Sequence, residues 1–79
     1  MASRRVDLSD AEAKCGDSAL GRVRRAYDGL RPGESLEVVT EVAEQVFAVR
    51  AWSRRAGGEV VEEVSAPGQT RLVVRRPAA

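Results

Sequence analysis

Cys15 is the single cysteine of the chain and the side chain best suited to covalent chemistry. It follows Lys14 and precedes Gly16, just ahead of a segment whose apolar spacing predicts a helix. The N-terminal end of a helix carries a partial positive charge and unpaired N–H groups, which favour a thiolate over a thiol, as a neighbouring ammonium does. A thiolate there could attack a sulfur donor, hold a persulfide and pass its terminal sulfur on.

Two other interpretations of Cys15 remain open at this point. The thiol can serve as a small buried hydrophobic group, or it can be an exposed thiol without a role. Asp17 also opposes activation, because a carboxylate close to a thiol raises the pKa of that thiol. Position alone therefore leaves both a nucleophile and an inert side chain as hypotheses.

Composition narrows the classes of function. With 79 residues the chain is expected to be a single domain over residues 1–79, with flexible tails at 1–4 and 77–79. Histidine is absent, so the commonest general base and metal ligand are missing, and neither a cofactor nor a metal is predicted. Thirteen basic and 12 acidic residues nearly balance, which argues against a polycationic nucleic-acid binder.

The same residues predict a compartment. A single thiol cannot form an internal disulfide, and extracellular domains of this size usually contain several. The first ten residues, MASRRVDLSD, lack the apolar core of a secretory signal, and no apolar run approaches the roughly 20 residues of a membrane span. The expectation is a cytoplasmic protein that does not enter a membrane.

Charged side chains supply two weaker candidates. Arginines at several places could bind RNA or an acidic protein if they gather on one side, or they could be solvated faces that cover apolar surface. Acidic residues between Glu34 and Glu44 could form a hard-cation site, although nothing supplies softer ligands. The arginines are Arg22, Arg24, Arg25, Arg31, Arg54, Arg55, Arg75 and Arg76, and the acidic residues are Glu34, Glu37, Glu41 and Glu44.

Two helices are predicted from apolar residues spaced three or four apart. Asp17 or Ser18 is a suitable N-cap for the first helix, and the Arg-Pro-Gly at 31–33 ends it. Gly57 and Gly58 end the second, in which Trp52 belongs to the core stripe and Phe47 lies beside it. The first stripe is Leu20, Val23, Tyr27 and Leu30, and the second is Val42, Val46, Val49, Trp52 and Ala56.

Four strands complete the pattern. Three of them are β-branched and apolar runs, and the first is a short alternation. The last two are expected to form an antiparallel hairpin with a loop of four or more residues. The order β-α-β-α-β-β predicts an α/β two-layer sandwich, with a four-stranded mixed sheet and both helices on one face. The predicted strands are Val6–Leu8, Ser35–Thr40, Glu59–Ser65 and Thr70–Arg75.

This arrangement resembles the TusA/SirA-like sulfur-carrier family. The stretch LRPGESLEVVT over residues 30–40 is similar to the family pattern L-x-P-G-E-x-L-E-V, and Ala51-Trp52 stands where the family has its Ala-Trp. Cys15 stands ahead of the first helix, as the family's cysteine does. Gly16 and Ser18 occupy the places of the two prolines in the family's Cys-Pro-x-Pro motif.

The resemblance implies a sulfurtransferase-like relay in the cytoplasm. Cys15 would carry a persulfide, supported by Lys14, Gly16 and Ser18, and a cysteine desulfurase or another sulfur donor would load it. Arg22 and Arg25 would dock the donor or a sulfur-acceptor protein in sulfur metabolism or thio-modification. Because the prolines are absent, the alternative is a diverged TusA-like binding or regulatory module that transfers no sulfur.

Overall fold

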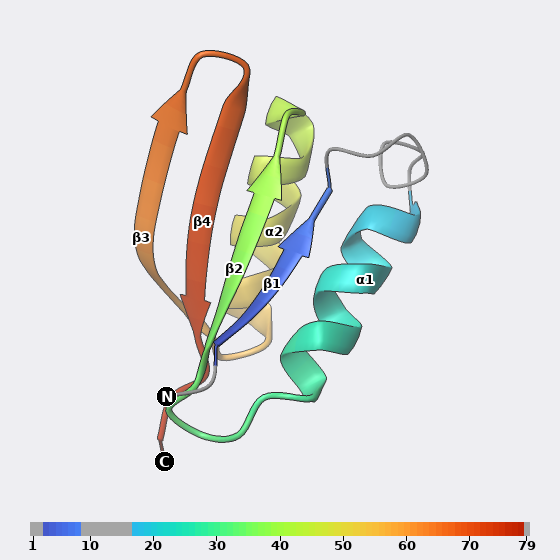
Figure 1. Ribbon diagram of the computed structural model, residues 1–79. Coiled ribbons are helices and arrows are strands. Elements are labelled where there is room, and N and C mark those ends of the chain that lie inside the picture. The colour runs from blue at the N-terminus through green and yellow to red at the C-terminus, as the bar shows by residue number, and fades with distance from the viewer. Residues whose placement is uncertain (1–2, 9–16, 79) are drawn as a thin grey trace.

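Six elements make up the computed structural model, which describes residues 3–8 and 17–78. The strands form one mixed sheet, and two helices cover one of its faces (Figure 1). This confirms the predicted α/β two-layer sandwich and the order β-α-β-α-β-β. The elements are β1 (Ser3–Asp7), α1 (Asp17–Asp28), β2 (Ser35–Thr40), α2 (Ala43–Arg55), β3 (Glu59–Ala66) and β4 (Gln69–Arg75).

The sheet order is β1-β2-β4-β3, which places β1 and β3 at its two edges. β1 is parallel to β2, whereas β4 is antiparallel to both β2 and β3. Both helices run antiparallel to β1 and β2, and their N-terminal ends lie at the end of the sheet where β1 and β2 finish. The chain between β1 and α1 begins and ends at this same end of the sheet.

β1 begins earlier than the predicted strand at residues 6–8. Ser3 pairs with Ser35 and Arg4 with Leu36, so these two residues belong to the sheet. The sequence had instead predicted a flexible tail over residues 1–4. Backbone pairing with β2 uses no side chain, which is why polar residues extend the strand beyond its apolar alternation. Leu8 follows β1, and its N–H donates to the Val39 carbonyl at 2.7 Å.

α1 begins at Asp17, so Asp17 and Ser18 are its first helical residues instead of alternative N-caps. The helix ends at Asp28, two residues before the end of the apolar stripe, and Leu30 is buried just beyond it. A glycine at position 29 accounts for the early end, because glycine is a poor helix former.

A Pro-Gly turn connects α1 to β2, and each of its four residues, 31–34, contributes to its geometry. The Glu34 N–H donates to the Arg31 carbonyl at 3.0 Å, and the Arg31 N–H donates to the Glu34 carboxylate at 2.7 Å. Pro32 fixes its own φ, and Gly33 has φ +91°, the combination that a type II turn requires. The stretch over residues 30–40, which is the part most similar to the sulfur-carrier pattern, thus contains a hydrogen-bonded turn that leads into the core strand β2.

The β3–β4 hairpin is tighter than predicted. Ala66 pairs with Gln69, so the loop contains two residues, Pro67 and Gly68, instead of four or more. Gly68 has φ +79°, which lets the chain reverse within two residues and lengthens both strands. A bulge between Val60 and Glu62 interrupts the β3 register.

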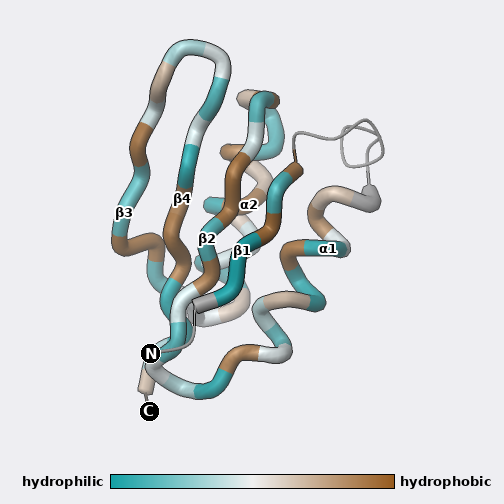
Figure 2. The backbone as a smooth tube through the Cα atoms, viewed as in Figure 1, coloured by the Kyte–Doolittle hydropathy of each residue, from teal (hydrophilic) through white to brown (hydrophobic). Residues whose placement is uncertain are grey.

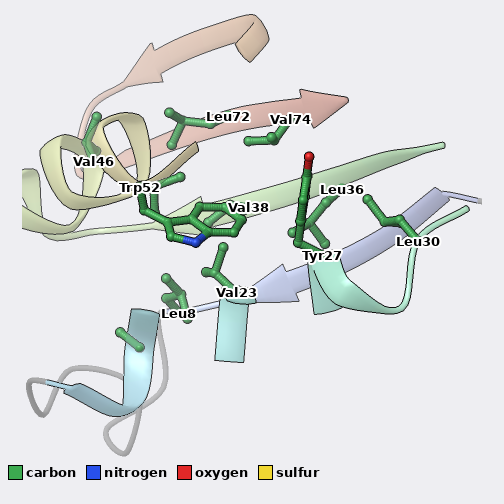
Figure 3. Packing of buried hydrophobic residues seen from close by; sticks show 12 residues of the cluster. Leu8, Val23, Tyr27, Leu30, Leu36, Val38, Val46, Trp52, Leu72 and Val74 are labelled. Atoms are coloured by element: carbon green, nitrogen blue, oxygen red, sulfur yellow. The ribbon is translucent and has the colours of Figure 1, made fainter. Parts of the chain in front are cut away.

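The core lies between the helices and one face of the sheet. Trp52 of α2 and Tyr27 of α1 meet edge to face, with ring centroids 5.0 Å apart (Figure 3). Leu36 and Leu72 project from β2 and β4 into the same layer and are fully buried. As predicted, Trp52 is a core residue, at 8% exposure, and Phe47 lies outside the core, at 65%.

The opposite face of the sheet carries ion pairs between strands. The Glu37 carboxylate of β2 accepts from Arg71 of β4 at 3.0 Å, and Arg71 also reaches Glu62 of β3 at 3.1 Å. Arg75 and Glu59 pair in the same way at 3.1 Å. Figure 2 shows hydrophilic residues next to hydrophobic ones in β2 and on both sides of a hydrophobic run in β4. Leu36 and Leu72 are buried under the helices, so their neighbours Glu37 and Arg71 point to the face without helices.

Candidate functional site

A largely apolar pocket lies between the N-terminal parts of the two helices. Its volume is about 210 Å³. The end of β1 and the first turns of α1 contribute one wall, and the start of α2 contributes the other. Among the described residues it is lined by Leu8, Ala19, Leu20, Val42, Glu44, Gln45, Ala48 and Val49.

Thr40 organises the α2 side of this pocket. Its side chain is fully buried, its hydroxyl accepts from the Val42 N–H at 3.1 Å, and it donates to the Gln45 side-chain oxygen. Val42 is the N-cap residue and has no side-chain oxygen to offer, so the threonine two residues earlier bonds to the cap's N–H. Sequence reasoning missed Thr40 and Gln45; the available signal was a hydroxyl residue just ahead of a helix.

The predicted nucleophile falls in the chain between β1 and α1. Cys15, Lys14 and Gly16 lie outside the described residues, and Ser18 is the second residue of α1. Both described ends of this segment reach the pocket, because Leu8 lines it on one side and Ala19 on the other. In the sequence Cys15 stands two residues before the first residue of α1.

The two predicted docking arginines lie on one side of α1, since they are three residues apart. Arg22 is half-buried, and Arg25 is exposed in the last turn of the helix. At about 1.5 Å per residue, Arg25 is about 12 Å along the helix axis from Asp17. Of the pair, Arg22 is therefore the nearer to the pocket.

The acidic residues suggested for a cation do not converge. Glu37 is held by Arg71 on the sheet face without helices, whereas Glu34 accepts a backbone bond in the turn before β2. Glu41 follows the far end of β2, and a strand of this length separates it from Glu34 by roughly 20 Å. No group of three or more acidic or sulfur ligands that could hold a metal occurs among the described residues.

A bidentate ion pair joins the middle of α2 to β3. The Arg50 guanidinium donates through Nε to one Glu63 oxygen at 2.8 Å and through Nη2 to the other. Hydrogen bonding from Arg50 lowers the pKa of the Glu63 carboxyl below its ordinary value. The same guanidinium lies over the Phe47 ring, 5.5 Å from its centroid.

This pair should make stability depend on pH. A carboxyl with a lowered folded-state pKa stabilises the fold above its unfolded pKa of about 4.3 and loses that contribution as the pH falls through the folded value. We expect Glu63→Gln to flatten the acid side of a plot of unfolding free energy against pH. Arg50→Gln should flatten it equally, and a wild-type profile in Arg50→Gln would contradict the assignment.

The chain was compared with protein-family models, curated proteins and solved structures. No protein-family model, curated protein or solved structure matches the chain. Neither α1 nor α2 nor any other helix within residues 3–8 and 17–78 has the length and apolar character to cross a membrane.

Proposed function

We propose that the protein is a cytoplasmic sulfur carrier, with Cys15 as the sulfur-bearing residue. The observation that supports this most is the meeting of two helix N-termini and an apolar pocket at the edge where the segment containing Cys15 leaves β1 and enters α1. Positive helix ends favour an anionic sulfur near them. The sequence resemblance to TusA-like carriers supports the same function.

The reaction is a thiol–persulfide exchange. The Cys15 thiolate attacks the outer sulfur of a persulfide on a donor such as a cysteine desulfurase, the donor's S–S bond breaks, and the donor leaves as a thiolate. A new S–S bond forms on Cys15. In the second exchange an acceptor thiolate takes the outer sulfur and Cys15 returns to a thiolate, so no external oxidant or reductant is consumed.

Neighbouring groups would lower the energy of the anions. Lys14 supplies a positive charge next to the sulfur in the sequence, and the N–H groups of the first turn of α1, which includes Ser18, are donors to an anion. Arg22 and Arg25 would then contact the acidic donor or acceptor protein.

The thiol pKa tests this proposal. A carrier requires a Cys15 pKa below the ordinary value of about 8.5, because the thiolate is the reacting species. The pH dependence of iodoacetamide alkylation, followed by mass spectrometry, measures it, with a cysteine-containing peptide of the same local sequence as the control. A pKa at or above that of the peptide would contradict the carrier and favour a binding or regulatory module with an inert thiol.

A further inference from the structure

At the end of the molecule opposite the pocket lie arginines that have no acidic partner among the described residues. We call it the arginine end and define it by Arg24, Arg25, Arg31, Arg54 and Arg55. All five side chains are exposed, and within the described part of the chain none of them makes an ion pair or a side-chain hydrogen bond. By contrast, Arg5, Arg50, Arg71 and Arg75 each hold a glutamate.

The fold brings this group together from separate parts of the sequence. Both helices run antiparallel to β1 and β2, so their C-terminal ends lie at the same end of the molecule (Figure 1). Tyr27 links them, because a Cβ built on Gly58, just after α2, would lie 3.1 Å from the Tyr27 hydroxyl. Helices packed in one layer are about 8–10 Å apart, a distance that arginine side chains can bridge.

Arg76 adds to the positive charge of this end. The Arg76 guanidinium donates to the Leu30 carbonyl at 2.9 Å and lies 5.6 Å from the centroid of the Tyr27 ring. Among the described residues, two carboxylates without a cationic partner lie nearby, those of Asp28 and Glu34, and Glu34 is engaged by the Arg31 N–H. The near-neutral net charge of +1 thus conceals a positive end.

Helix dipoles account for part of this distribution, since cations near helix C-termini are stabilising. That effect falls off within one turn, and it gives no reason for Arg31, which follows the end of α1. Like charges gathered in this way repel one another, and an anionic partner removes the repulsion. Guanidinium groups match carboxylates and phosphates with two parallel hydrogen bonds.

We propose that the arginine end docks an acidic polypeptide segment rich in Asp and Glu. A single-stranded nucleic acid is disfavoured because it relies on exposed aromatic rings for stacking. Tyr27 and Trp52 are buried at this end, and the exposed Phe47 lies about two turns before Arg54 on α2. The surface lies away from the pocket, so it acts whether or not Cys15 carries sulfur.

Fluorescence anisotropy with a labelled oligoglutamate peptide tests this docking. We expect binding at low salt that weakens as salt is added. The double variant Arg24→Gln/Arg54→Gln should weaken it about tenfold, within the range that two exposed ion pairs contribute. The matched control Arg5→Gln/Arg71→Gln removes the same charge from the sheet face and should change affinity less than about twofold.

Three results would overturn the proposal. Equal weakening in both double variants would mean that net charge alone attracts the peptide. Tighter binding of an oligouridylate of equal length would assign the surface to nucleic acid. Absence of peptide binding at low salt, with circular dichroism showing folded protein, would remove the docking surface altogether. Thiol reactivity of Cys15 is unchanged in each of these cases, so the proposed function is judged separately.

Discussion

Replacing Trp52 by alanine should lower the free energy of unfolding by about 3–5 kcal/mol. The indole is 8% exposed, packs edge to face on Tyr27, and fills the layer between α2 and the sheet (Figure 3). Removing it leaves a cavity that this small core cannot close, and domains of this kind are stable by only about 5–15 kcal/mol. Urea denaturation followed by circular dichroism measures the loss.

Phe47→Ala is the matched control, because it removes an aromatic ring from the same helix. This ring is 65% exposed, and its described partner is the Arg50 guanidinium. The change should alter the free energy of unfolding by no more than about 1 kcal/mol. A comparable loss in the two variants would mean that Trp52 is not a core residue and that the packing described here is wrong.

Thr40→Val should lower the free energy of unfolding by about 1–3 kcal/mol, although it keeps the shape of the side chain. The buried hydroxyl bonds to the Val42 N–H and to the Gln45 side chain, and valine can satisfy neither. The N–H ahead of α2 would be left without its partner at the wall of the pocket. Thermal and urea denaturation measure the change.

Thr40→Ser separates the hydroxyl from the methyl group. Serine keeps both hydrogen bonds and loses one buried methyl, so the loss should stay near 1 kcal/mol. Hydrogen exchange of the first turn of α2 should rise in Thr40→Val and stay near wild type in Thr40→Ser. The reverse order of stability, with serine below valine, would show that packing and not the hydroxyl matters at this position.

Periodicity was enough to predict the layers of the fold. Trp52 and Phe47 are both aromatic and belong to one helix, yet their spacing relative to Val46 and Val49 separated the buried ring from the exposed one. The start of β1 was missed because Ser3 and Arg4 join the sheet through backbone groups that carry no sequence signal. The hairpin loop was overestimated because Pro67 and Gly68 complete the turn alone.

The candidate site was harder to predict. Cys15 was proposed from its place in the sequence and lies outside the described residues. The pocket arises from Leu8, Ala19 and Val49, which are distant in the chain and look like ordinary core residues. The arginine end was equally hidden. Acidic and basic residues interleave along the sequence, and the unpaired arginines come together because both helices run antiparallel to β1 and β2 and end at the same end of the molecule.

The resemblance to sulfur carriers consists of a scaffold stretch around residues 32–36 and of Cys15, and these two parts support the proposed function to different degrees. Pro32, Gly33 and Glu34 form a turn, and Leu36 is fully buried beyond it, so this stretch serves the scaffold. A binding module built on the same scaffold would need the same residues. The residue that distinguishes a carrier from such a module is Cys15, and the central proposal therefore depends on its sulfur.

Sulfur loading of Cys15 is the most direct test of the proposed function. The protein is incubated with a cysteine desulfurase, its cofactor and free cysteine, and intact mass spectrometry without reductant follows. The sulfur-carrier proposal predicts a gain of one sulfur atom, lost on adding a thiol reductant and absent in Cys15→Ser. No gain on the wild type, or an equal gain on Cys15→Ser, would contradict it.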